Sequence, residues 1–147
     1  MVEVSIHLAA SPHDVFEIVS DPDTYPAWLV GAKRIRSVDP DFPGPGSSFE
    51  HEVGAGPVSA HDESDVEHVE ADRRLDLIVR ARPWLEAEVT FLVEPDGDGT
   101  RLRLQEDPVG PYRALRWLID PLVRIRNRTS LRRLAAYVQR DGGGITG

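Results

Sequence analysis

Five histidines are the residues best suited to chemistry in this sequence: His7, His13, His51, His61 and His68. His51 shares the alternation of Phe49 in a predicted strand, which places it on the apolar face of that strand. If Val53 opposes Val58 across the following turn, His61 faces the other way, whereas a slip of one residue would bring the two histidines together. On the apolar face, His51 could act as a general base or bond to a ligand carbonyl. It could equally be a structural histidine held by a neighbouring side chain.

Metal and cofactor chemistry is not expected. A closed metal site needs at least a third ligand beside a pair of histidines, and His68 is poorly placed to supply it. The sequence has no cysteine, which excludes disulfides and thiolate chemistry. It also lacks a glycine-rich phosphate loop and a nucleophile elbow. We therefore expect no metal and no cofactor.

Three further polar residues occur where apolar ones are expected. Glu106 continues the inward alternation of Leu102 and Leu104, so it is either an acid at the rim of a cavity or a solvated strand end. Asn127 and Ser130 interrupt the apolar stripe of a long helical pattern. They could contact a ligand, or they could bond to helix carbonyls or water.

That helical pattern runs from Pro111 to Arg140 and organises the rest of the chain. A helix of this length spans roughly 40 Å. Pro121 predicts a kink or a restart, and we favour one kinked helix because the apolar stripe keeps its phase across the proline. The stripe consists of Tyr112, Leu115, Ile119, Val123, Leu134 and Tyr137 with Val138.

The formal net charge of −8 is unevenly distributed. Residues 111–140 hold eight arginines and one acidic residue, for +7, which leaves −15 on the rest of the chain. The simpler interpretation, which we favour, is a basic helix lying on an acidic body. The alternative is docking of the arginine face to an anionic lipid or a protein, a peripheral contact to which Leu118, Leu122 and Ile125 would add.

The other elements predict an α+β domain over residues 1–140, followed by a flexible tail over 141–147. An alternating strand over 2–8 precedes two short helices, the first capped by Ser11 and the second over 23–31. A tight turn is expected at Arg82-Pro83. Leucine, valine and phenylalanine side chains share one face of the sheet. The remaining predicted strands cover residues 33–38, 48–53, 58–69, 75–81, 85–93 and 100–106.

This order resembles the START-like superfamily, also called helix-grip or SRPBCC, and within it the polyketide cyclase/dehydrase-like proteins. The matching segments span nearly the whole chain. The resemblance implies a START/Bet v 1-like fold, in which a curved antiparallel sheet of about seven strands grips a long C-terminal helix. The segments are 11–16 (SPHDVF), 21–28 (DPDTYPAW), 73–75 (RRL), 97–100 (GDGT) and 130–134 (SLRRL).

The resemblance implies that a hydrophobic small molecule, such as a lipid or a polyketide, binds in an apolar cavity between sheet and helix. The alternatives are a cyclase or dehydratase that uses acid–base residues, with His51 and Glu106 as candidates, and surface docking through the arginine-rich helix. No signal-peptide pattern is apparent, so we expect a cytoplasmic protein. We also expect a monomer or homodimer with no nucleic-acid partner. The expected ligand contacts are Trp28, Phe49, His51, Val89, Phe91, Leu104, Ile119, Val123, Asn127 and Ser130.

Overall fold

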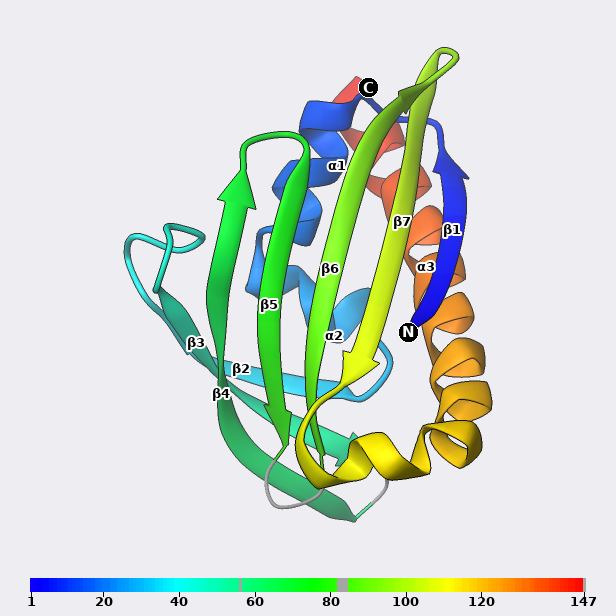
Figure 1. The fold of residues 1–147 in the computed structure, drawn as a ribbon. Coiled ribbons are helices and arrows are strands. Elements are labelled where there is room, and N and C mark those ends of the chain that lie inside the picture. The colour runs from blue at the N-terminus through cyan, green and yellow to red at the C-terminus, as the bar shows by residue number, and fades with distance from the viewer. Residues whose placement is uncertain (56, 82–84, 147) are drawn as a thin grey trace.

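The computed structural model describes residues 1–55, 57–81 and 85–146 of the chain. Within them, seven antiparallel strands form one sheet in the order β1-β7-β6-β5-β4-β3-β2 (Figure 1). The first two strands of the sequence therefore lie at opposite edges of the sheet. The strands are β1 (Val2–Leu8), β2 (Ala32–Val38), β3 (Ser48–Ala55), β4 (Val58–Glu70), β5 (Arg74–Ala81), β6 (Leu85–Asp96) and β7 (Gly99–Pro108).

Two short helices connect β1 to β2. They are α1 (Pro12–Val19) and α2 (Tyr25–Trp28), and the 3-10 turn η1 (Pro22–Thr24) lies between them. Ser11 caps α1 as predicted, because its Oγ accepts a hydrogen bond from the N–H of Asp14 at 3.1 Å. Gly31 follows α2 with a φ of +97°, a conformation that glycine adopts without strain.

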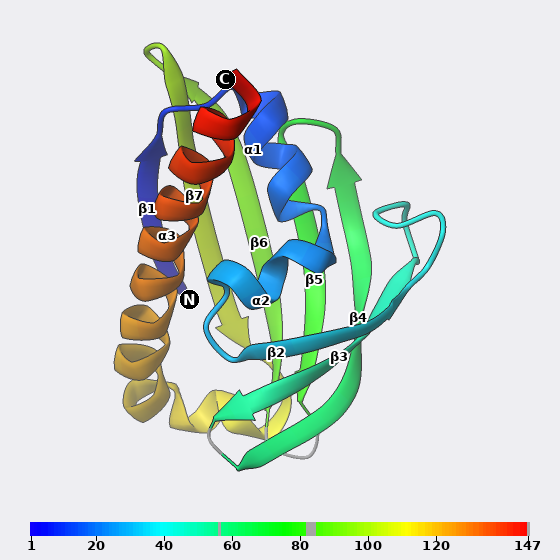
Figure 2. The same ribbon diagram turned by 180° about the vertical axis from the view of Figure 1, so that it is seen from behind.

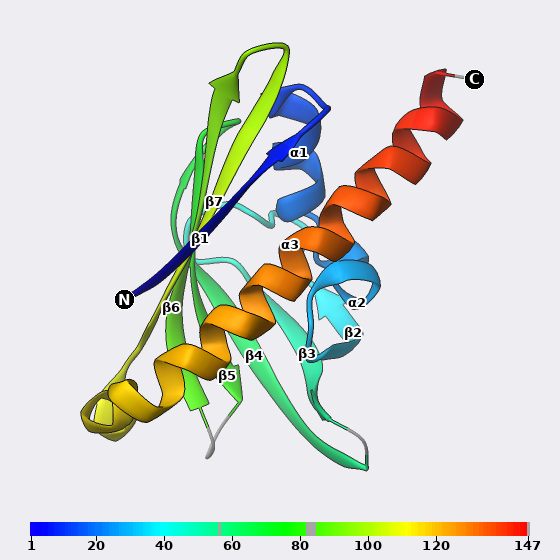
Figure 3. The ribbon, with the colours of Figure 1, turned by 90° about the vertical axis from the view of Figure 1, so that its right-hand side faces the viewer.

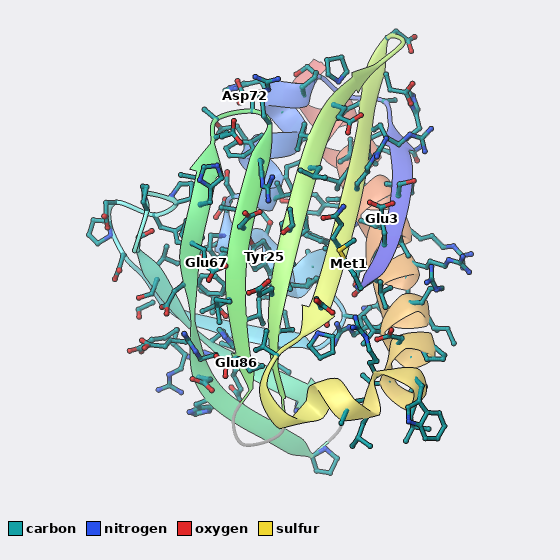
Figure 4. All side chains as sticks on the ribbon, viewed as in Figure 1. Met1, Glu3, Tyr25, Glu67, Asp72 and Glu86 are labelled. Carbon is teal, nitrogen blue, oxygen red and sulfur yellow. The ribbon has the colours of Figure 1, made fainter. Side chains whose placement is uncertain are left out.

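The sheet is apolar on one face only, as predicted. Glu67 and Glu86 lie on the outer face (Figure 4), where Arg80 Nη1 contacts Asp65 Oδ2 at 2.6 Å and Arg80 Nε contacts Glu86 Oε1 at 3.2 Å. The inner face is covered by α1, α2 and the C-terminal helix (Figure 2). Its buried residues include Leu75, Leu77, Val89, Phe91, Leu102 and Leu104.

The strand register differs by two residues from the one considered for the first long hairpin. Val53 pairs with Ala60 instead of Val58, because β3 continues to Ala55, which itself pairs with Val58. A shift of two residues preserves the facing of every side chain, so His51 stays on the inner face. His61 is exposed on the outer face, so the two histidines do not meet. The turn expected at 82–83 lies outside the described residues.

The long helix α3 (Arg116–Thr146) continues through Pro121 as one helix. It begins later than predicted, because residues 110–115 form the 3-10 turn η2 (Gly110–Leu115). A 3-10 turn has three residues per turn, which takes Leu115 out of phase with the stripe, and its side chain is exposed. The helix also runs beyond Arg140, where the sequence predicted a tail to begin. It crosses the open face of the sheet diagonally, beside β1, with α2 against its middle (Figure 3).

Candidate functional site

Aromatic side chains fill the part of the inner face that lies against α2. Trp28 has no exposed surface, and its ring centre lies 5.4 Å from that of Tyr25 and 6.1 Å from that of Phe91. Phe49 packs against Tyr25 at 5.7 Å, and Leu104 is buried in the same cluster. The predicted ligand contacts Trp28, Phe49, Phe91 and Leu104 are therefore part of the hydrophobic core.

His51 lies beside this aromatic cluster on β3. Its ring centre is 5.4 Å from that of Phe49, and only 2% of its surface is exposed. The Nε2 atom lies 2.8 Å from the Oγ of Ser64, a fully buried residue of β4. The Nδ1 atom is also buried, and no residue in the described part of the chain bonds to it. One ring nitrogen is thus held in place while the other is free.

The environment of His51 favours the neutral imidazole. Burial lowers the pKa of His51, and the negative charge of Asp62, its partner in the strand register, opposes that shift only in part. If Nε2 carries the proton and donates it to Ser64, then Nδ1 is an acceptor able to take a proton from a ligand. If Ser64 donates instead, then Nδ1–H is a donor able to bond to a carbonyl. Either tautomer leaves one polar function facing apolar surroundings.

Glu106 is buried on β7 and is bound by α3. Nη2 of Arg126 donates to both carboxylate oxygens, with a distance of 2.5 Å to Oε2. Nδ2 of Asn127 donates to Oε1 at 3.3 Å, and Nε of Arg126 donates to the Oδ1 of Asn127 at 3.3 Å. Glu106 is therefore not a solvated strand end. It is the centre of a closed group of three side chains on the inner face.

Ser130, the other polar residue of the helix stripe, joins two elements of the fold. Its Oγ accepts a hydrogen bond from the N–H of Val30 at 3.0 Å and donates one to the carbonyl of Arg126 at 3.1 Å. The side chain has no exposed surface. Its hydrogen-bonding capacity is used by the protein itself, so this position holds α3 against the loop after α2.

Of three further predicted apolar contacts, Val89 lies beside Glu106, and Val123 and Ile119 precede Asn127 on α3. Val89 pairs with Glu106 across β6 and β7, and it is largely buried. Val123 precedes Asn127 by one helical turn and is also buried, whereas Ile119, one turn earlier, is half-buried. The structure therefore brings Val89 and Asn127 to Glu106. His51 lies on β3, which β6, β5 and β4 separate from the strand of Glu106.

A separate surface pocket lies between α1, η1 and the segment that joins β2 to β3. It has a volume of about 510 Å³, and its lining includes Phe16, Ile18, Phe42 and Tyr137. None of the predicted ligand contacts lines it.

In the parts of the chain that the structure describes, no group of three or more histidine, aspartate or glutamate side chains is arranged to hold a metal ion. None of the helices there has the length and apolar character required to cross a bilayer.

Comparison with protein families gives a match over residues 1–139, to the family described as polyketide cyclase/dehydrase and lipid transport. The chain belongs to this family. Its fold is the helix-grip fold that the sequence predicted. No curated protein matches the sequence at a significant level.

Solved structures similar to this polyketide cyclase/dehydrase-family protein share its fold at low sequence identity. NE0264 from Nitrosomonas europaea aligns with a TM-score of 0.75 at 16% identity, over 95% of this chain and 94% of its own. StfQ, a di-domain ARO/CYC from the steffimycin biosynthetic pathway, aligns with a TM-score of 0.73 at 13% identity, over 96% of this chain and 51% of its own. DynU16, from the dynemicin biosynthetic locus, gives 0.69 at 20% identity, over 94% of this chain and 46% of its own.

Three residues of the inner face were missed from the sequence of this family member. Arg126 is one of the eight arginines of the long helical pattern, and it reaches the buried carboxylate of Glu106. Ser64 shares the alternation of the buried Val66, a signal that predicts an inward-facing hydroxyl. Asp62 follows from the same alternation. The alternation of side chains along β4 is enough to place Ser64 and Asp62 on the inner face. The pairing of Arg126 with Glu106, by contrast, can be predicted only when the position of α3 is known.

Proposed function

We propose that this family member binds a hydrophobic small molecule that carries at least one oxygen atom, between the curved sheet and α3. The observation that carries the proposal is the buried, unpaired Nδ1 of His51. Leaving a buried polar atom unpaired costs about 1–3 kcal/mol, so such atoms are uncommon unless a ligand uses them. A hydroxyl or carbonyl oxygen of a ligand would satisfy Nδ1 in one of its two tautomers.

Two further features support a ligand of this class. Val89 and Val123 are buried apolar residues, and Glu106 and Asn127 are buried polar residues that bond to each other. An apolar lining with a few placed polar groups is typical of small-molecule sites. The family description includes both polyketide cyclase/dehydrase activity and lipid transport. An aromatic polyketide or a lipid is therefore the ligand class we propose.

The test is a calorimetric titration with two probes, 1,8-dihydroxyanthraquinone for the polyketide class and oleic acid for lipids. We expect binding of at least one probe, and His51→Leu should weaken it by about 5- to 30-fold, the equivalent of one lost hydrogen bond. His61→Leu is the matched control, because that histidine lies on the outer face. Absence of binding by both probes, or equal affinity in the His51→Leu and His61→Leu variants, would contradict the proposal.

A second candidate function is proton transfer on the bound molecule, as in a cyclase or dehydratase. The observation that favours it is the lowered pKa of His51, since a neutral imidazole with a free nitrogen can accept a proton. In an aldol-type cyclisation, Nδ1 would take a proton from the carbon between two carbonyls, and the resulting carbanion would attack a third carbonyl. The imidazolium would then return the proton to the alkoxide formed on that third carbonyl, which gives a hydroxyl group and the neutral His51 again. Incubation with a poly-β-ketone should then give a cyclic product, and His51→Gln should abolish the enzymatic rate. An unchanged rate in that variant would exclude His51 as the base.

A further inference from the structure

The end of η2 and the outward side of the first part of α3 expose a row of apolar side chains. The row comprises Leu115, Trp117, Leu118, Leu122 and Ile125, and we call it the α3 ridge. Exposed fractions run from 46% for Leu115 to 74% for Trp117. Apart from Met1, every large apolar side chain that is exposed in the described residues belongs to this ridge. Scattered exposed leucines are ordinary on a protein surface, but a concentration of them along one helix marks an interaction surface.

The helical spacing makes the ridge continuous and separates it from the buried stripe. Leu118, Leu122 and Ile125 follow one another at intervals of four and three residues, so they lie on one face of the helix. The buried residues Val123, Asn127 and others of the stripe occupy the opposite face. The ridge therefore contributes nothing to the sheet–helix contact, and its exposure is independent of the proposed ligand site.

Arginines continue the same surface towards the C-terminus. Arg128 and Arg132 follow Ile125 at three and seven residues on the same face, and Arg133 is exposed beside them. Among the described residues none of the three has a carboxylate partner, unlike Arg116 and Arg126, which pair with Asp107 and Glu106. No acidic residue occurs in α3 from Pro121 to Arg140.

We infer that the α3 ridge and its flanking arginines dock onto an anionic phospholipid surface. A convex ridge on one helix can insert between lipid head groups, since lipid needs no complementary groove. Trp117 is suited to the boundary between acyl chains and head groups, and the guanidinium groups of Arg128, Arg132 and Arg133 are suited to phosphate. The outer face of the sheet points away from α3 (Figure 3), and the chain outside residues 111–140 carries a formal charge of −15. This charge separation orients the molecule with α3 towards a negative surface.

Charge also argues against a second copy of the chain as the occupant. A symmetric contact of ridge with ridge would place two sets of unpaired arginines at one interface, with no acid on that part of α3 to meet them. Lipid phosphate groups supply the negative charge that such a contact lacks.

The test measures retention of the full chain by sedimented vesicles of phosphatidylcholine with and without phosphatidylglycerol. We expect retention only with phosphatidylglycerol, falling at least tenfold when salt is raised to about 0.5 M. Tryptophan emission should shift to shorter wavelength on binding, because Trp28 is already buried and Trp117 is exposed. Trp84→Phe as a background restricts the signal to those two residues. Trp117→Phe in that background should remove the shift.

Two sets of substitutions identify the surface. Leu118→Gln, Leu122→Gln and Ile125→Gln together, and Arg128→Gln, Arg132→Gln and Arg133→Gln together, should each lower vesicle retention at least tenfold without lowering the melting temperature. A control with the same loss of charge replaces Arg36, Arg101 and Arg103 by glutamine, and it should bind as the original chain does. The inference is overturned by a lack of retention at low salt, or by full retention of either the apolar-ridge variant or the arginine variant. It is also overturned by a solution dimer that the leucine and isoleucine substitutions convert to a monomer, which would assign the ridge to a second copy.

Discussion

The Oγ of Ser130 accepts a hydrogen bond from the backbone N–H of Val30, and this single contact ties α3 to the loop between α2 and β2. The hydroxyl of Ser130 is withdrawn from water, and Val30 is half-buried. A buried donor that loses its acceptor keeps the full cost of desolvation. The packing of α3 against the rest of the domain therefore depends on this hydroxyl group as well as on apolar contacts.

Ser130→Ala is expected to lower the free energy of unfolding by about 1–3 kcal/mol, because it leaves the N–H of Val30 unpaired. The measurement is urea denaturation followed by circular dichroism. Thr129→Ala is the matched control, since the hydroxyl of Thr129 donates to the carbonyl of Ile125 within its own helix and, among the described residues, to no other element. That control should change stability by less than about 0.5 kcal/mol. Equal effects of the two substitutions would show that the contact with Val30 does not stabilise the fold.

Glu106→Gln is expected to cost about 1–3 kcal/mol of stability, because it removes the buried carboxylate that pairs with Arg126, a half-buried side chain. Glu94→Gln removes a carboxylate from an exposed pair with Arg103 at 3.4 Å, and it should cost less than about 0.5 kcal/mol. Thermal unfolding of both variants gives the comparison. A stability of Glu106→Gln equal to that of the control would mean that the buried pair only offsets its own desolvation.

The pKa values of His51 and His13 are expected to be shifted in opposite directions from the ordinary value of 6.5. Burial lowers the pKa of His51, whereas the hydrogen bond to Asp72 raises the pKa of His13. Nuclear magnetic resonance of the imidazole C–H protons should therefore show His13 losing its proton at higher pH than His51. The reverse order would contradict the burial of the His51 ring.

The same shift makes stability depend on pH. The pKa of His51 is lower in the folded chain than in the unfolded one, so the unfolded chain takes up the proton first as pH falls. The stability that the neutral His51 contributes is fully present above a pH of about 6.5, and it is lost as the pH falls from there towards the pKa of His51 in the folded chain. His51→Gln should flatten stability over that interval, measured by urea denaturation at several pH values. An unchanged slope would assign the acid sensitivity to other groups.

Gly99→Ala is expected to destabilise the fold by about 2–4 kcal/mol. A Cβ atom at position 99 would lie 2.3 Å from the carbonyl oxygen of Leu8, which is backbone and can give way only if β1 moves. Asp98→Ala, at the neighbouring exposed position, should have a much smaller effect. Chemical denaturation of both variants distinguishes them, and a stable Gly99→Ala variant would show that the end of β1 is free to shift.

The sequence predicted the facing of side chains better than their partners. Phe49 and His51 were placed on the inner face by alternation alone, and a register shift of two residues left that assignment intact. The contacts of Glu106 with Arg126 and Asn127 could not be predicted, because they depend on the rotation and position of α3 over the sheet. Helical periodicity gives the face of a helix, but it does not say where that helix lies.

Helical periodicity also failed at two positions, each for a local reason. Leu115 fits the apolar spacing, but the 3-10 turn before Arg116 directs it outwards. Arg126 is charged, so the pattern assigned it to solvent, yet its long side chain reaches a buried carboxylate from the border of the apolar stripe. The conformation of η2 thus determines the exposure of Leu115, and the length and charge of the arginine side chain determine the pairing of Arg126.

The strand order has a consequence for how the chain folds. Strands β2 to β7 each pair with the strand next to them in sequence, so they can zip together hairpin by hairpin through short loops. By contrast, β1 is synthesised first but pairs only with β7, as in the contact between Val4 and Leu104. On the ribosome, this first strand has to wait with an unpaired edge until almost all of the sheet has emerged. Docking of β1, which closes the longest loop in the sheet, is thus expected to be the last and slowest event in forming the grip.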